Sequence, residues 1–451
     1  MAGTNLYRTP TIRTNDRKFT YSCWFKRSKI ESDQYLVTNY ESGTNRGWIS
    51  FQSDDKIFFY DIAGGTDRFE ATSNFKLRDT NSWYHLLYSV DTTASSNKTK
   101  IYINGVDRYS DFTVPVARTS NAEVGFQKGV TSNGFRVGSQ QTGSTSFDGL
   151  MSHINFVDGL QLDASAFGET DSTTGEWKIK TSPTVSEYGN NGFFILKDGN
   201  SVTDQSGKGN NFGIGGSVGS LTKSEDNPSN VFATYNATYQ SSQHSTTKGN
   251  TEGVGGNSSW YMKTSSLGAS SGKFYAEVKC SNAGGGTGII GIVDLDDCKG
   301  YAVVDSHFGK TAVTPDGRGF AWYSSDGKIY FNDTSTSVFG TWGTNSILML
   351  AMDIDNQKFY IGKDGTWLNS GDPTSGSTGT GAVQNWTSSA GGTWTFADAL
   401  ANGCTMQWNW GNGYFGTTAV ASAGTNASGN GIFEYDVPTG FTALTTKGLN
   451  L

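Results

Sequence analysis

The fold of this chain is decided by the stretch Asp353-Ile354-Asp355-Asn356-Gln357-Lys358-Phe359-Tyr360-Ile361-Gly362-Lys363-Asp364-Gly365. An apolar run, residues 347–352, leads into it. This pattern is typical of a β-hairpin. Apolar residues precede a polar turn with Asp and Asn, and an aromatic run that begins with Lys and ends in glycine follows it. The sequence therefore predicts two antiparallel strands that are joined at residues 353–357.

An earlier stretch repeats this design. Residues 83–91 read Trp-Tyr-His-Leu-Leu-Tyr-Ser-Val-Asp, and after a polar loop residues 100–105 read Lys-Ile-Tyr-Ile-Asn-Gly. Again an apolar strand ends at Asp, and a Lys-led aromatic strand runs into Gly. The sequence therefore predicts the same hairpin in each half of the chain.

Length and composition favour several β domains. A chain of 451 residues is too long for one compact sandwich and suggests two or three domains. Its 59 glycines, together with 13% aromatic and 17% charged residues, suit short strands, many turns and a neutral polar surface. Residues 19–26, 47–51 and 56–60 alternate with period two, and no useful helical periodicity occurs. An all-β antiparallel fold is therefore expected.

The first domain is expected to span residues 1–160. It contains, in this order, Trp83-Tyr84-His85, Lys100-Ile101-Tyr102-Ile103-Asn104-Gly105, Phe135-Arg136-Val137-Gly138, Phe147-Asp148-Gly149 and Ile154. This succession resembles LamG-like, concanavalin A-type jelly rolls. This resemblance implies a β-sandwich with loops gathered at its ends. Residues 161–256 are poorer in strand patterns and rich in Gly, Ser, Asn and Asp, and are expected to form a structured connector.

The second domain is expected to span residues 257–416. Residues 273–280 alternate cleanly, and residues 288–293, 319–323 and 406–411 are further strand candidates. With Trp260-Tyr261 and the hairpin quoted above, this order resembles a SPRY domain, although Asp364 stands where that family usually has Asn. The predicted fold class is all-β: two antiparallel jelly-roll sandwiches, with a C-terminal tail segment at residues 417–451.

The order of both halves resembles structural proteins of marine tailed bacteriophages. That resemblance extends to residues 204–212, residues 367–376 and the closing run Val437-Pro438-Thr439-Gly440-Phe441. It implies a virion protein, either a capsid decoration or a tail fibre or spike, that is made in the host cytoplasm. Its expected partners are copies of itself, other virion structural proteins and host surface glycans.

Charge and composition exclude several functions. A net charge of −7, a pI near 5.2 and the lack of any Lys/Arg block argue against nucleic-acid binding. The longest apolar run, residues 347–352, is too short for membrane insertion. Cys23, Cys280, Cys298 and Cys404 are scattered without C-x-x-C spacing, which argues against disulfides and zinc ligands. Cys23 and Cys280 lie in apolar-alternating strands and are expected to be small buried hydrophobes.

The sequence offers no catalytic residues. Glucanases with a concanavalin A-type sandwich place carboxylates on one strand as Glu-x-Asp-x-x-Glu, and no such run is present. The histidines His85, His153, His244 and His307 lie in separate segments without metal-ligand spacing. We therefore expect a protein that is not an enzyme. The alternatives are a glycan-processing hydrolase on the same folds and a protein-binding SPRY module.

Carbohydrate binding is the function that these exclusions leave. Aromatic rings stack on sugars, and neighbouring polar groups bind their hydroxyl groups. Tyr60, Trp367 and Trp386 lie near Gly- or Asp-rich turns and are the candidates, with packing inside their own domains as the alternative. Asp294, Asp296 and Asp297 would supply hard oxygen ligands for Ca²⁺, with turn formation and solvation as the alternative. No other cofactor is expected.

Overall fold

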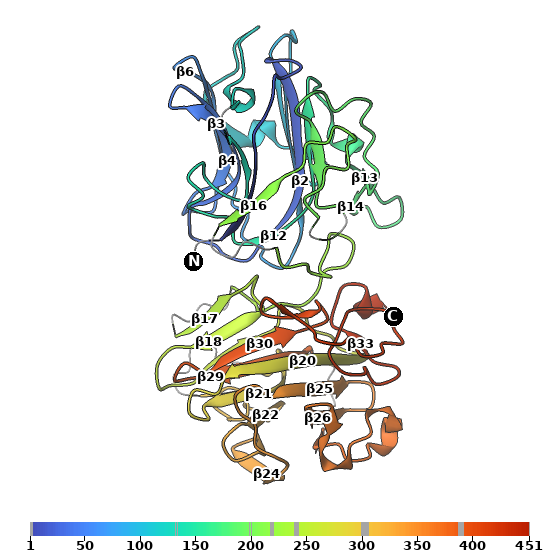
Figure 1. The fold of residues 1–451 in the computed structure, drawn as a ribbon. Coiled ribbons are helices and arrows are strands. Elements are labelled where there is room, and N and C mark those ends of the chain that lie inside the picture. The colour runs from blue at the N-terminus through green and yellow to red at the C-terminus, as the bar shows by residue number, and fades with distance from the viewer. Residues whose placement is uncertain are drawn as a thin grey trace. The chain divides into compact units, whose positions relative to one another are not determined.

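The computed structural model describes residues 3–130, 132, 134–197, 199, 201–216, 221–238, 243–298, 306–386 and 392–450. The chain forms two units, Met1–Lys223 and Ser224–Leu451. Each contains two large sheets, so the all-β prediction is confirmed (Figure 1). Short 3₁₀ turns are the helical elements of the described residues: η1 (Tyr109–Asp111), η2 (Gly125–Gln127), η3 (Ala164–Ala166), η4 (Leu368–Ser370), η5 (Pro373–Thr378) and η6 (Gly448–Asn450).

The first unit contains an eight-stranded antiparallel sheet. Its order is β10-β6-β5-β4-β3-β11-β1-β16. The strands are β1 (Thr4–Arg8), β3 (Gln34–Ser42), β4 (Asn45–Phe51), β5 (Ile57–Ala63), β6 (Thr66–Ser73), β10 (Phe112–Val116), β11 (Phe135–Val137) and β16 (Gly213–Gly216).

A six-stranded sheet faces it, with the order β15-β12-β2-β7-β8-β9. Its strands are β2 (Lys18–Arg27), β7 (Tyr84–Asp91), β8 (Thr99–Ile103), β9 (Val106–Asp107), β12 (Gly149–Asp158) and β15 (Phe193–Ile195). A separate hairpin, β13 (Gly168–Thr170) and β14 (Trp177–Ile179), lies on the side of β2 away from β3 and β4 (Figure 1).

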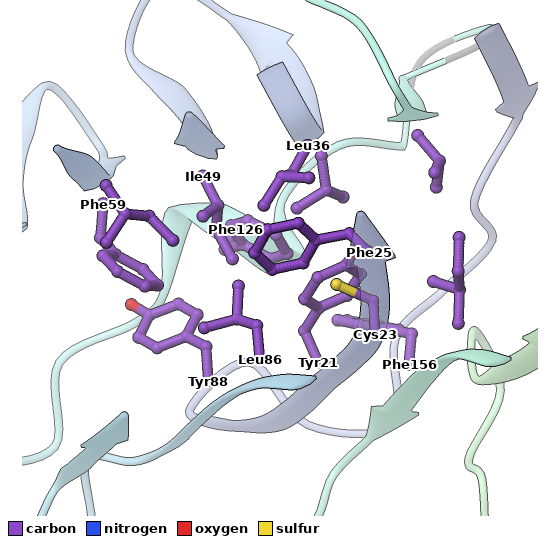
Figure 2. Packing of buried hydrophobic residues seen from close by; sticks show 14 of the residues in the cluster. Tyr21, Cys23, Phe25, Leu36, Ile49, Phe59, Leu86, Tyr88, Phe126 and Phe156 are labelled. Atoms are coloured by element: carbon purple, nitrogen blue, oxygen red, sulfur yellow. The ribbon is translucent and has the colours of Figure 1, made fainter. Parts of the chain in front are cut away.

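The core of the first unit lies between the two sheets. Period-two alternation on β2 turns Phe19, Tyr21, Cys23 and Phe25 inward, as the sequence predicts. Figure 2 shows three of these side chains meeting Leu36 and Ile49 of the opposite sheet, with Phe126 of η2 between the sheets. Burial of this apolar surface is the main favourable contribution to the stability of the sandwich.

The second unit has a larger and a smaller sheet. The larger follows the path β17-β18-β30-β20-β25-β26-β27, with β28 on β26 and β33 parallel to β20. Its strands are β17 (His244–Thr247), β18 (Glu252–Gly255), β20 (Lys273–Asn282), β25 (Ile347–Asp353), β26 (Lys358–Lys363), β27 (Thr366–Trp367), β28 (Gln384–Asn385), β30 (Thr405–Asn409) and β33 (Thr442–Ala443).

The smaller sheet has the order β19-β29-β21-β22-β23-β24. Its strands are β19 (Tyr261–Thr264), β21 (Gly288–Asp294), β22 (Gly319–Tyr323), β23 (Lys328–Phe331), β24 (Thr334–Val338) and β29 (Trp394–Leu400), and β31 (Tyr414–Phe415) pairs with β32 (Thr418–Ala419) outside both sheets. Among the described residues no helix is long and apolar enough to cross a membrane.

The repeated hairpin predicted from the sequence is present in both units, because β7 pairs with β8 and β25 pairs with β26. A second, two-residue turn follows each of these hairpins. Asn104-Gly105 joins β8 to β9, and Asp364-Gly365 joins β26 to β27. All four residues have positive φ, between 49° and 83°, which is the conformation of a two-residue type I′ turn and explains glycine at its second position. The Asn104 carboxamide oxygen accepts the His85 N–H at 2.7 Å, and the Asp364 carboxylate accepts the Ile347 N–H at 2.8 Å. The same turn therefore closes the same kind of hairpin twice.

The expected connector and tail are parts of the sandwiches in the structure. Of residues 161–256, β15 and β16 extend the sheets of the first unit, and β17 and β18 extend the larger sheet of the second. Of residues 417–451, β33 pairs with β20. The buried Glu277 carboxylate also accepts the backbone N–H groups of Glu434 and Tyr435, both at 2.8 Å. These segments find their partners far away in the sequence, and a pattern search along the chain does not detect such pairing.

Candidate functional site

The outer face of the six-stranded sheet is covered by the chain that follows β12. The Thr20 hydroxyl donates to the Leu160 carbonyl at 2.8 Å, and the Ser89 hydroxyl donates to the Leu162 carbonyl at 2.9 Å. Phe167 is buried in a small apolar cluster on the same side. This face is therefore occupied by the protein itself.

His85 of β7 contacts the chain that covers this face. Its ring stacks between Trp24 and Trp177, with centroids 5.0 and 5.8 Å away. The Trp177 indole donates to Nδ1 at 3.1 Å, and the Ser22 hydroxyl lies 2.8 Å from Nε2. Burial lowers the pKa of His85 to about 3, so the imidazole is neutral at ordinary pH. Gly168 makes room for the indole, because a Cβ there would lie 2.4 Å from the Trp177 ring. His85 thus secures the hairpin β13–β14.

The outer face of the eight-stranded sheet carries a different set of side chains. The strand registers align one residue from each of six strands as cross-strand neighbours. We call this set the outer row: Tyr7 on β1, Arg136 on β11, Thr38 on β3, Trp48 on β4, Tyr60 on β5 and Glu70 on β6. With about 4.8 Å between strands, the distance from Tyr7 to Tyr60 is about 19 Å. Thr38 is buried, and the other five side chains are half-buried.

Four rings form an aromatic cluster in and beside this row: Tyr35, Trp48, Phe58 and Tyr60. The Trp48 ring centroid lies 4.5 Å from that of Tyr60 and 6.1 Å from that of Tyr35. Phe58 lies 6.2 Å from Tyr60 with an interplanar angle of 19°. The Arg46 guanidinium is 5.5 Å from the Trp48 centroid. Half-buried rings packed against one another provide an apolar platform with a polar border.

Charged groups surround one end of this platform. The Tyr60 hydroxyl donates a short hydrogen bond to the Asp67 carboxylate. Burial and Asp67 raise the pKa of Tyr60 to about 12, and Glu70 acts in the same direction while Arg46 opposes it. The phenol therefore remains protonated, and these side chains offer hydrogen-bond donors and acceptors beside the rings.

A hollow of about 380 Å³ adjoins the other end of the row. Tyr7 belongs to both the hollow and the row, and Arg8, Thr11, Asn210 and Asn211 also line the hollow. Its volume is at the lower end of the range of ligand pockets, roughly 300–1,000 Å³. The platform and the hollow together form the candidate site.

The predicted carbohydrate-binding residues end up in different environments. Tyr60 lies in the aromatic cluster. Trp367 is half-buried at the edge of the larger sheet of the second unit, with its ring 6.2 Å from that of Tyr275. Trp386 is only 8% exposed, and its ring packs on Trp394 at 4.5 Å and Phe320 at 5.5 Å. Trp386 must be withdrawn as a sugar ligand, because its ring lies inside the core.

The predicted calcium ligands do not form a cation site. The Asp294 carboxylate accepts the Arg318 guanidinium at 2.5 Å, and Asp297 accepts the backbone N–H groups of Asp316 and Arg318 at 3.0 and 2.9 Å. Asp296 points to solvent. A guanidinium therefore occupies the position a metal would need, and the alternative of turn formation fits these residues better. In the part of the chain that the structure describes, no three acidic, His or Cys side chains could hold a metal.

A cluster of polar side chains is fully buried in the second unit. Tyr235 and Trp408 donate to the Asp398 carboxylate, and His244 Nε2 lies 3.6 Å from its other oxygen. Burial raises the pKa of Asp398 to about 7 and lowers that of His244 to about 3. Because these side chains are fully buried, no ligand reaches them, and we assign the cluster a structural role.

Sequence reasoning missed most of the outer row. Trp48 falls in a strand that was predicted, and its alternation with Ile49 marks it as outward-facing. Tyr7 and Arg136 lie far from it in sequence and become neighbours only through the strand order. Alternation could have identified single outward rings, but not their alignment.

Comparisons with known proteins found a family model that matches the first part of the chain. Residues 2–165 match the family model described as the concanavalin A-like lectin/glucanases superfamily, a LamG-like domain. The SPRY domain of human HERC1 is 12% identical, with 35% of this chain and 87% of that chain covered and a TM-score of 0.26. A putative carbohydrate binding protein from Bacteroides ovatus is 16% identical, with coverages of 48% and 57% and a TM-score of 0.33. No curated protein matches the chain.

Proposed function

We propose that the protein is a non-enzymatic virion component of a tailed bacteriophage that binds host surface glycans through the outer row. It acts as a homo-oligomer, as a capsid decoration or a tail fibre, together with other structural proteins of the particle. The aromatic cluster on the outer face of the eight-stranded sheet carries this proposal.

The cluster has the chemistry that sugars need. The apolar faces of pyranose rings stack on aromatic side chains, and Trp48 and Tyr60 offer such rings 4.5 Å apart. Asp67, Glu70 and Arg46 border them with acceptors and donors for hydroxyl groups. The row crosses six strands over about 24 Å and so suits an extended oligosaccharide rather than a single small ligand.

A binding role is favoured over hydrolysis. Asp67 and Glu70 are the carboxylates of the outer row and its border, and both adjoin Tyr60 at one end of the platform. A glycosidase needs a protonated carboxyl group, usually produced by burial, opposite a second carboxylate. Asp67 is exposed, and its carboxylate already accepts the Tyr60 hydroxyl. This arrangement supports binding without turnover.

Display on a particle makes shallow binding useful. A half-buried platform with few charges suits affinities of roughly millimolar strength, and repetition on one particle converts these into firm attachment. A homo-oligomer on a symmetric virion supplies that repetition.

The decisive experiment compares the wild-type protein with Trp48→Ala on immobilised host envelope polysaccharide and a glycan array. We expect roughly tenfold weaker binding of the variant with an unchanged circular dichroism spectrum, since one stacking surface is removed. Trp260→Ala, at a half-buried tryptophan of the other unit, serves as the matched control. Equal binding of the wild type and Trp48→Ala would remove the outer row from the proposal.

Two further measurements test the virion role and the absence of enzymatic activity that we propose. Antibody labelling and mass spectrometry of purified particles should detect the protein, and a monomer absent from virions would contradict the virion role. A reducing-end assay on bound glycans should give background rates. Turnover that Asp67→Asn or Glu70→Gln abolishes would favour the hydrolase alternative.

A further inference from the structure

The hollow beside Tyr7 is built around a buried arginine. Arg8 is only 6% exposed. Its guanidinium donates to the Asn191 carbonyl at 3.3 Å and to the Asn210 carboxamide oxygen. A guanidinium has five N–H donors, so these two bonds leave donor capacity at the wall of the hollow.

Neighbouring groups add donors rather than acceptors. The Asn211 carboxamide oxygen accepts the Asp204 N–H at 2.8 Å, which leaves its amide N–H₂ as the available group. Tyr7 adds a hydroxyl group. The Asn191 carboxamide is already taken, because its oxygen accepts the Thr11 N–H at 2.7 Å and its nitrogen donates to the Thr11 carbonyl.

Two arginines at this end of the row lack an ion pair. Among the described residues no carboxylate lies within 4 Å of Arg8 or Arg136, although most arginines of the core have one. Arg136 donates to the Asn5 carboxamide oxygen at 3.0 Å, and its guanidinium is 5.7 Å from the Tyr7 ring centroid.

More distant carboxylates do not fully balance Arg8. Burial lowers the pKa of Arg8 to about 10, although Asp204 and Asp158 act in the opposite direction. Both carboxylates are engaged elsewhere: Asp204 accepts the Phe194 N–H at 2.9 Å, and Asp158 accepts the Thr14 N–H at 2.7 Å. An anionic ligand would relieve the cost of this buried cation.

We propose that the hollow is an anion-accepting subsite of the glycan site, which selects glycans that carry an acidic group on a sugar unit. The inference rests on the proposed glycan binding and adds the ligand class. A carboxylate or a sulfate ester pairs with the guanidinium and the Asn211 amide, while adjoining neutral units run along the outer row towards Trp48. Both groups share this chemistry, and the experiment distinguishes them.

The test compares three immobilised glycans with the full-length protein: polygalacturonate, the same polymer with its carboxyl groups reduced to alcohols, and a sulfated galactan. Asn211→Asp keeps the oxygen that accepts the Asp204 N–H but replaces the donor with a negative charge. Asn257→Asp is the matched control, because that exposed side chain accepts the Ser259 N–H at 3.0 Å in the other unit. Arg136→Gln, which removes the cation beside Tyr7, serves as a second variant.

We expect wild-type protein to bind at least one acidic polymer roughly tenfold more tightly than the reduced polymer at low salt. This preference should shrink as salt increases and on addition of inorganic sulfate at matched ionic strength. Asn211→Asp and Arg136→Gln should lose the preference, and Asn257→Asp should keep it. Preference for polygalacturonate indicates a carboxylate, and preference for the galactan indicates a sulfate ester.

Other outcomes overturn the inference. If acidic and reduced polymers bind equally while Trp48→Ala weakens both, the row binds glycans but the hollow does not select acids. If the acid preference survives in Asn211→Asp and Arg136→Gln, the acidic group binds elsewhere. If no polymer binds, both the inference and the proposed glycan binding are wrong.

Discussion

Replacing Glu277 by glutamine should change how the stability of the second unit depends on pH. The Glu277 carboxylate is fully buried and accepts four hydrogen bonds, from the backbone of Glu434 and Tyr435, from the Tyr275 hydroxyl and from the Asn409 amide. Despite these donors, burial raises the pKa of Glu277 from 4.5 to about 7. The folded state therefore binds this proton more tightly than the unfolded chain does.

The direction and the size of this pH effect follow from the linkage between proton binding and folding. Because the folded pKa lies above the unfolded one, stability is highest below pH 4.5 and falls as the pH rises to about 7. A pKa change from 4.5 to about 7 corresponds to about 3 kcal/mol, at 1.36 kcal/mol for each tenfold change in proton affinity. For a unit of this size that corresponds to a change in Tm of about 6–12 °C.

Glu277→Gln removes this titration, while Asp398 and His244 titrate in both proteins and cancel in the comparison. The measurement is differential scanning calorimetry of both proteins from pH 4 to 8. The stability of wild type minus that of the variant should fall by about 3 kcal/mol across this range, and only in the transition of the second unit. Glu169→Gln, an exposed residue of β13, is the matched control. A difference that is constant with pH would refute the reasoning.

Three further predictions follow from packing and hydrogen bonds. Trp386→Ala should destabilise the second unit by about 3–5 kcal/mol in urea unfolding, because a buried indole is lost, and a change below 1 kcal/mol would contradict its place in the core. Calcium and EDTA should leave the Tm unchanged within about 1 °C, since Arg318 already pairs with Asp294, whereas a rise of several degrees with calcium would contradict this. Trp177→Phe should speed hydrogen exchange in residues 168–179, because the donor to His85 is lost at a cost of about 1 kcal/mol; unaltered protection would show that packing alone holds the hairpin.

Local pattern was enough to identify the strands and their buried faces. Phe19, Tyr21, Cys23 and Phe25 occupy every second position of β2, and in a strand such spacing points the set to one side. The hairpin at Asp364-Gly365 was likewise predictable, because an Asp-Gly pair adopts positive φ at low cost and so closes a two-residue turn.

The pairing of strands far apart in the chain could not be predicted from the sequence. Residues 161–256 read as a connector because their strands are short, and their partners, such as β12 for β15, lie elsewhere in the chain. The tail is held by the pairing of β33 with β20 and by the buried carboxylate of Glu277, which accepts backbone N–H groups more than 150 residues away. Neither pairing leaves a periodic signal in the chain.

The candidate site shows the same division. Composition and alternation could place Tyr60 on a strand with one exposed face, and they did. They could not reveal that Trp386 is enclosed by Trp394 and Phe320, nor that Tyr7, Arg136, Trp48 and Tyr60 align across neighbouring strands. Side-chain direction along one strand is a local property with period two, whereas the alignment of side chains across a sheet depends on strand order and register, which tertiary packing alone decides.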